Sequence, residues 1–186
     1  MTASAFLGGD GVTLHPTEDD DAAFCADLVN DPRVRHGLSF ARPKRADDER
    51  EIRVDSDDDF VPFVVRAVDD PDAGDEDDRI GVVDLFDLDE QFGTAEVGYF
   101  FRPQAWGNGY ATAAVERVVD YAFDELRLHR INARVYAFND ASTRVLETVG
   151  FEREGRLREQ AYMHGERVDE LRYGLLESER EQPTAD

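Results

Sequence analysis

Two glycines, Gly107 and Gly109, lie in a segment that has the residue types of a phosphate-binding turn. Glycine has no Cβ, so it adopts positive φ and lets a ligand approach the backbone closely. A turn of this kind directs successive N–H groups inward, and a helix that follows it adds partial positive charge. The segment, residues 102–112, is therefore predicted to bind a phosphate or pyrophosphate. Glycines at such a connection are also ordinary turn residues, and the segment matches neither a P-loop nor the longer dinucleotide fingerprint.

Periodic strands and helices surround this segment. Residues 94–101 alternate as a strand that runs into it, and an apolar face at i, i+3, i+4 and i+7 predicts a helix over about 109–126. Three successive strands between residues 61 and 101 predict an antiparallel meander. The other predicted strands are 12–15, 130–136, 159–163 and 168–176, and the other predicted helices are about 17–29, 46–54 and 139–149.

The length and the single cysteine limit the class of protein. A chain of 186 residues with one cysteine, Cys25, fits a single domain without an internal disulfide, which favours a reducing compartment. No apolar run approaches the roughly 20 residues of a membrane span. Residues 1–9 lack the basic and apolar regions of a signal peptide. We therefore expect a cytoplasmic protein with no membrane partner.

The formal net charge of −22 is extreme. A chain this acidic lacks the positive footprint that nucleic-acid binding needs, so no nucleic-acid partner is expected. The 41% hydrophobic content favours a folded chain over a disordered one. The composition is typical of a halophilic-type acidic surface, and it predicts loss of the fold in low salt, where the charges repel one another without screening.

A second motif, N-x-x-S-x-x-V-L-x-x-x-G-F, runs from Asn139 to Phe151. Together with the Q-x-x-G-x-G-Y-A-T run from Gln104 to Thr112, it resembles the GNAT superfamily of N-acetyltransferases. The closest likeness is to the branch that contains the ribosomal-protein N-terminal acetyltransferases. Asp169 and Tyr173 extend the resemblance into a final hairpin, so it spans nearly the whole chain. Ala113 departs from it, because this branch often carries a glutamate there.

The resemblance implies an α/β (α+β) fold of the GNAT type. Its mixed central sheet has about seven strands, splays in the middle and carries helices on both faces. Residues 1–176 would form a single N-acetyltransferase domain, and residues 177–186 would form a charged C-terminal tail. Acetyl-CoA, the expected cosubstrate, would lie in the gap between the two splayed strands.

The same resemblance implies the coenzyme contacts. Backbone amides of Phe100 and Phe101 would pair with the pantetheine arm, amides over residues 104–110 would bind the pyrophosphate, and Asn139 would bond the pantetheine. Two arginines would offset the charge of CoA, with surface ion pairs as their alternative role. The predicted cofactor-binding set is Phe100, Phe101, Arg102, Gln104, Ala105, Trp106, Gly107, Asn108, Gly109, Tyr110, Ala111, Asn139, Ser142 and Arg144.

Amide formation from a thioester needs a neutral amine, although an α-amino group has a pKa of about 8 and a lysine about 10.4. Glu96 is the candidate catalytic base, with a cross-strand salt bridge as its alternative role. Ser142 is the candidate acid for the departing thiolate, and its alternative is a hydroxyl that bonds the helix backbone. Tyr136 and Tyr162 are further proton-donor candidates, and a main-chain amide near residues 99–101 would bind the oxyanion. The four histidines have no metal-ligand spacing, so no metal site is expected.

Three functions remain open at this point. The first is acetyl-CoA-dependent, direct transfer of an acetyl group to a primary amine, namely a protein N-terminal α-amine. The second keeps the reaction and replaces the acceptor with a small-molecule amine, such as a polyamine. The third is a CoA-binding module without turnover. An exposed strand edge also makes a homodimer an expectation.

Overall fold

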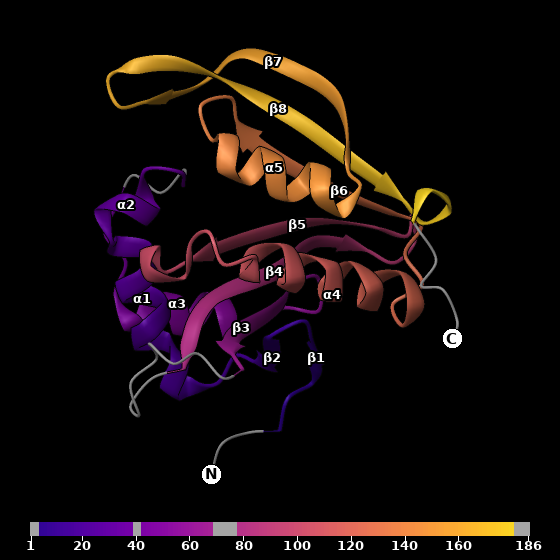
Figure 1. Cartoon of the computed structure of the whole chain (residues 1–186). Coiled ribbons are helices and arrows are strands. Elements are labelled where there is room, and N and C mark those ends of the chain that lie inside the picture. Colours follow the sequence, from indigo (N-terminus) through magenta and orange to yellow (C-terminus); the bar gives the residue numbers. More distant parts are fainter. Residues whose placement is uncertain (1–3, 39–41, 69–77, 181–186) are drawn as a thin grey trace.

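Eight strands form one sheet in the order β1-β2-β3-β4-β5-β6-β8-β7 (Figure 1). The computed structural model describes residues 4–38, 42–68 and 78–180. Most of the predicted acidic connection at 69–78, and the charged tail beyond residue 180, lie outside these residues. The strands are β1 (Leu7–Gly9), β2 (Val12–Pro16), β3 (Val61–Ala67), β4 (Arg79–Asp89), β5 (Thr94–Phe101), β6 (Arg130–Tyr136), β7 (Glu152–Met163) and β8 (Glu166–Leu176).

The predicted antiparallel meander is confirmed, since β3 pairs with β4 and β4 pairs with β5. The sheet has one strand more than the seven that the sequence predicts. The additional strand is β1, which joins β2 through a tight turn at Asp10 and Gly11, with φ values of 52° and 83°. An Asp-Gly pair is a characteristic hairpin signal, because both central residues of such a turn need positive φ.

The centre of the sheet is split between β5 and β6, the only parallel neighbours in the described sheet. Their pairing ends after Thr94 opposite Arg130, Ala95 opposite Ile131 and Glu96 opposite Asn132. Beyond this point β5 stays paired with β4 as far as Phe101, and β6 stays paired with β8 as far as Tyr136. The two halves of the sheet therefore separate after Glu96, which confirms the predicted splay.

Helices cover both faces (Figure 1). The N-terminal helices α1 (Ala22–Asn30), α2 (Pro32–Arg35) and α3 (Ala46–Arg53) lie on one side, and α4 (Tyr110–Asp124) and α5 (Asp140–Val149) lie on the other. Along β5, alternate side chains point to opposite faces. Val97 and Phe101 belong to the core beneath α4 and α5, whereas Phe100 packs against the core beneath α1.

A buried ionic network fixes α3 to β4. Arg53 is 5% exposed, and its Nε and Nη1 lie 2.9 Å from Glu49 Oε2 and 2.6 Å from Asp84 Oδ1. Both carboxylates are buried, so the guanidinium is the group that makes their burial tolerable. Burial raises the pKa of Asp84, and the Arg53 charge opposes that shift. The guanidinium also lies 5.3 Å from the ring of Phe100, beside the split.

Among the described residues, no helix combines the length and the apolar character required to cross a bilayer.

Candidate functional site

The glycine segment forms the predicted strand-to-helix turn. Strand β5 ends at Phe101, a 3-10 turn covers Pro103–Ala105, and α4 begins at Tyr110. The indole Nε1 of Trp106 donates to Phe101 O at 2.9 Å and ties the turn to the end of the strand. Gly107 and Gly109 have φ values of 80° and 83°, the left-handed region that favours glycine.

This turn is open to a ligand. A Cβ built on Gly107 or Gly109 meets no heavy atom within 4 Å, so the space beside both residues is free of other parts of the chain. The first hydrogen bond of the helical pattern runs from Ala113 N to Gly109 O at 3.0 Å. The N–H groups of Tyr110, Ala111 and Thr112 precede it and have no intrahelical acceptor. An anion bound there would also gain from the dipole of the 15-residue helix.

Two of the predicted pyrophosphate contacts need correction. The N–H of Ala105 donates to Arg102 O at 2.9 Å, and the N–H of Trp106 donates to Pro103 O at 3.3 Å. Both amides are used inside the 3-10 turn, which the glycine pattern alone does not show. The predicted cradle therefore keeps Gln104 and the run from Gly107 into the first turn of α4, without the amides of Ala105 and Trp106.

The register of β5 also revises the predicted pantetheine contacts. Arg102 N donates to Ile80 O at 2.8 Å, and Phe100 pairs with Val82 two residues earlier in the same ladder. In an antiparallel ladder, the backbone groups of alternate residues point to the same neighbour. The Phe100 amide therefore points toward β4, and the amides of Tyr99 and Phe101 point toward the split. The Phe101 amide thus points toward the split, as the predicted contact requires, whereas the Phe100 amide does not, and the Tyr99 amide is available in its place.

Asn139 and Ser142 lie together at the start of α5. Asn139 is the N-cap of this helix, and its Oδ1 accepts from Ser142 N at 3.2 Å. This bond uses the amide oxygen of Asn139 and leaves its Nδ2 as a donor. Gly37 lies close to this nitrogen, since a Cβ added to Gly37 would approach it to 3.1 Å. The Ser142 hydroxyl lies 2.8 Å from the phenol oxygen of Tyr99, across the split. The predicted bond from this hydroxyl to the helix backbone is not the contact that the structure shows.

Glu96 forms an ion pair with Arg134 of β6. Its side chain is 12% exposed, and burial raises the pKa of Glu96, whereas the hydrogen bond and charge of Arg134 lower it. Strand alternation places Glu96 on the face opposite to Tyr99, so the carboxylate and the Ser142 hydroxyl flank the split from its two sides. The predicted salt bridge is thus present, and the position at the end of the parallel ladder also suits a base.

The other predicted site residues are not gathered at one point. Gln104 and Asn108 are exposed on the turn, and Ala105 is buried beneath it. Arg102 stacks on Phe24 with its guanidinium carbon 4.7 Å from the ring centroid. Arg144 is exposed on α5 and forms no ion pair with a described residue. The structure therefore brings the glycine turn, Glu96 and Ser142 to the split, and the charge-offsetting role of Arg102 and Arg144 stays a prediction.

Tyr99 and Arg134, the partners of Ser142 and Glu96, are not among the residues predicted from the sequence. A signal for Tyr99 existed, because it alternates with Val97 and Phe101 on a face that is otherwise apolar. A tyrosine hydroxyl in such a place needs a hydrogen-bond partner.

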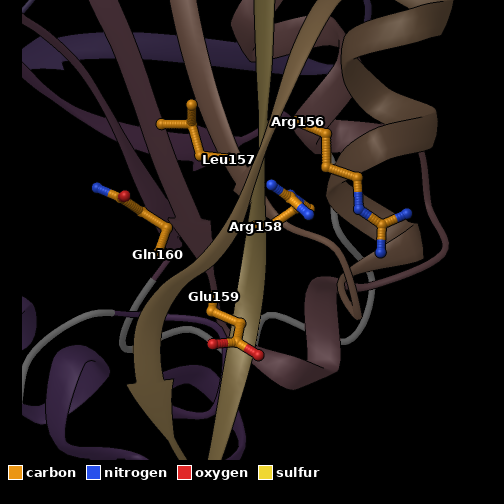
Figure 2. A pocket seen from close by; sticks show the side chains of 5 residues that line it. All are labelled: Arg156, Leu157, Arg158, Glu159 and Gln160. Atoms are coloured by element: carbon orange, nitrogen blue, oxygen red, sulfur yellow. The ribbon is translucent and has the colours of Figure 1, made fainter.

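A surface hollow of about 550 Å³ lies on β7 and contains none of the predicted site residues. Its side chains point in different directions from an irregular stretch of the strand and do not converge on one point (Figure 2). Asp169 stabilises this stretch by accepting from Glu159 N at 2.7 Å and pairing with Arg156. The hollow is lined by Arg156, Leu157, Arg158, Glu159 and Gln160.

A mixed sheet that splits between two parallel strands, with an anion cradle at the end of one of them, is the architecture of an acetyl-CoA-dependent acyltransferase. The chain belongs to the GNAT acetyltransferase family: residues 12–152 match the family model described as "Acetyltransferase (GNAT) domain".

Three proteins illustrate the similarity. The Bacillus subtilis protein YdaF is named as a putative ribosomal N-acetyltransferase. It is 32% identical to this chain over 178 residues, and the match covers 91% of this chain and 93% of YdaF. The N-acetyltransferase p20 of Bacillus licheniformis, named as uncharacterized, is 36% identical over 103 residues; the match covers 55% of this chain and only 58% of that protein. The structure of spermidine N-acetyltransferase from Vibrio cholerae with CoA and spermine has a TM-score of 0.80 at 27% identity, covering 91% of this chain and 97% of the other.

Proposed function

We propose that this protein is an N-acetyltransferase that transfers the acetyl group of acetyl-CoA directly to a primary amine. The observation that carries the proposal is the end of β5–β6 pairing at Glu96 on the strand that leads into the glycine turn. The open backbone groups of β5 lie along the split, and the open helix N-terminus lies at its end. An extended pantetheine arm that ends in a pyrophosphate needs both features in this order.

The geometry supports a set of proposed coenzyme contacts. The amides of Tyr99 and Phe101 pair with the pantetheine arm, Asn139 Nδ2 donates to it, and the amides from Gly107 to Ala111 bind the pyrophosphate. Gln104 and Asn108 border the cradle as exposed polar side chains. Acetyl-CoA itself supplies the activated thioester, so the reaction needs no covalent intermediate on the protein.

The chemistry is a proton-balanced exchange of an amine for a thiolate. Glu96 takes a proton from the amine as the nitrogen attacks the thioester carbonyl. A main-chain amide over residues 99–101 stabilises the oxyanion. As the carbon–sulfur bond breaks, Ser142 donates its proton to the sulfur and takes one from solvent, while Glu96 releases to solvent the proton that it gained. The products are the N-acetyl amine and CoA thiol.

The acceptor in our proposal is a protein N-terminal α-amine. The likeness to YdaF, which extends over 93% of that protein, supports this choice. A polyamine is the second candidate, because a spermidine N-acetyltransferase shares the fold with a TM-score of 0.80. The two classes differ in acidity: at about pH 7.5 an α-amine with a pKa of about 8 is partly neutral, whereas an alkylamine with a pKa of about 10.4 is almost fully protonated.

Thiol release from acetyl-CoA, measured over a panel of peptides and polyamines, tests this proposal. We expect release with peptides that carry a free N-terminus and none with the same peptides after N-terminal blocking. With an α-amine acceptor, kcat/KM reaches a plateau above about pH 8. Release with spermidine alone would select the second acceptor class. CoA binding without release for any amine would indicate a binding module and overturn the proposed activity.

The cradle is tested by a charge change at Gly107. Asparagine and aspartate both tolerate positive φ and have nearly the same size, and the space beside Gly107 accepts either. We expect Gly107→Asp to bind CoA at least about tenfold more weakly than Gly107→Asn, because one added negative charge faces the pyrophosphate. Calorimetric titration with CoA measures the difference, and added KCl should reduce it. Equal affinities of the two variants would contradict the cradle.

We also propose a cytoplasmic homodimer with a salt-stabilised fold. Strand β7 ends the sheet and has no strand neighbour beyond it in the described chain. Exposed residues of both charges alternate along this edge, so two copies that meet along β7 can set opposite charges against each other. They are Glu152, Arg153, Glu154, Arg156, Arg158 and Glu159. Light scattering in molar KCl should give twice the chain mass of 21.0 kDa. A monomer mass at all concentrations would contradict the dimer.

A further inference from the structure

The phenol of Tyr99 bridges the two sides of the split. Tyr99 extends from β5 and contacts Ser142 on α5, 43 residues away, at two atoms. Its oxygen lies 2.8 Å from Ser142 Oγ and 3.1 Å from the main-chain Ser142 O. We propose that Tyr99 is a positioning residue that decides whether the Ser142 hydroxyl proton is available to the leaving thiolate. The inference rests on the proposed acid role of Ser142.

The two contacts define two hydrogen-bond arrangements. A main-chain carbonyl oxygen only accepts, and the neutral phenol has a single proton. When Tyr99 donates to Ser142 O, the contact with Oγ is satisfied only if the serine donates its own proton to the phenol. When Tyr99 donates to Oγ instead, the serine proton is free to point elsewhere.

The second arrangement suits proton donation to sulfur. Ser142 then accepts a hydrogen bond from Tyr99 while its own O–H is free, and accepting a bond polarises the hydroxyl and makes it a stronger donor. The change between the two arrangements is a rotation of the phenol O–H, and no proton leaves Tyr99. Solvent returns a proton to Ser142 after the transfer to sulfur, and Glu96 releases to solvent the proton that it took from the amine.

Both partners are held in place by their backbones. Tyr99 pairs with Val83 in the continuous β4–β5 ladder, and Ser142 N is bonded to the Asn139 side chain in the first turn of α5. Burial raises the pKa of Tyr99, so the phenol stays neutral across the pH range of an assay. Within the described part of the chain, Tyr99 is the group that hydrogen-bonds Ser142 Oγ.

A double-mutant cycle tests the inference with three variants: Tyr99→Phe, Ser142→Ala and the combination. Phenylalanine keeps the ring and removes the hydroxyl. We expect Tyr99→Phe to lower kcat by about tenfold, the effect of losing one strong hydrogen bond in the transition state. The KM for acetyl-CoA should stay within about twofold, since the backbone amide of Tyr99 is retained. In the Ser142→Ala background, Tyr99→Phe should cause no further loss.

Tyr121→Phe is the matched control, because it removes a phenol from α4, where the ring contacts Phe6 and Phe63. It should retain the wild-type kcat, and the melting temperatures of all variants should show intact folds. An equal loss from Tyr99→Phe with and without Ser142 would overturn the inference, as would an unchanged kcat in the single variant. A wild-type kcat in Ser142→Ala would instead refute the proposed acid role, and with it the inference. A loss in Ser142→Ala without one in Tyr99→Phe would refute the inference alone.

Discussion

Changing Glu96 to glutamine is expected to lower kcat/KM for the amine by about 100- to 1,000-fold, within the usual range for loss of a general base. The Glu96 carboxylate lies at the last residue pair of the parallel β5–β6 ladder, beside the opening that the acetyl group enters in our proposal. Glutamine has nearly the same size but does not accept the proton of the attacking amine. Initial rates of thiol release with saturating acetyl-CoA measure the change.

Arg134→Gln is the matched control, because both substitutions break the same ion pair. Burial raises the pKa of Glu96, and Arg134 lowers it, so removing Arg134 raises this pKa further. The base is inactive when protonated, below its pKa. The acidic limb of the kcat/KM profile should therefore move to higher pH in Arg134→Gln, while the plateau rate is retained. Equal losses in both variants at every pH would assign Glu96 to the salt bridge alone.

The sequence predicts the geometry of the glycine turn more completely than the hydrogen-bond partners of Glu96 and Ser142. The turn depends on residues close together in the chain, whereas these partners come from distant segments. Positive φ at Gly107 and Gly109 and the helix that starts at Tyr110 are local properties, and all three appear as predicted. The helix stop at Gly150, with a φ of 105°, is local in the same sense.

The contacts of Glu96 and Ser142 depend instead on strands that are far apart in the chain. Arg134 faces Glu96 because the β5–β6 register sets Glu96 opposite Asn132, and no local pattern specifies that register. Tyr99 reaches Ser142 because β5 leaves β6 at the split while α5 returns over it. Side-chain periodicity identifies the face of each strand, but not the residue that it will meet.

The ends of the sheet were also predicted incompletely. Strand β7 begins at Glu152, seven residues before the predicted start at Glu159. Residues 152–159 are mainly exposed and charged, because β7 is an edge strand with little core to face. Such a segment lacks the apolar alternation by which a half-buried strand is recognised. The tail begins as a short 3-10 turn, and Arg180 after it pairs with Asp124 of α4 at 2.7 Å.

The second large effect is expected at Arg53, where methionine should lower the free energy of unfolding by about 3–5 kcal/mol. Methionine fills a similar volume but leaves the carboxylates of Glu49 and Asp84 buried without a counter-charge. Chemical denaturation at constant salt measures the loss. The triple variant with Glu49→Gln and Asp84→Asn should recover much of it, because an uncharged network avoids the penalty of an unpaired buried charge.

Arg50→Met is the matched control on the same helix. Arg50 also pairs with two carboxylates, Asp19 and Asp55, each at 2.6 Å, but its side chain is 46% exposed. Exposed pairs contribute about 0–1 kcal/mol, so the two arginines should differ several-fold in their effect on stability. A loss at Arg53 no greater than that at Arg50 would contradict the role of the buried network.

The effect of Arg53→Met on the free energy of unfolding should also depend on pH. Asp84 already has a raised pKa because it is buried, and without the Arg53 charge this pKa rises further. A carboxyl whose pKa is higher in the folded than in the unfolded state favours folding at low pH, and this contribution is lost as pH rises through the folded pKa. The stability deficit should therefore shrink as pH falls from 8 toward 5.

Because Arg53 also supports Phe100 on β5, the same variant should weaken acetyl-CoA binding as α3 loosens from β4.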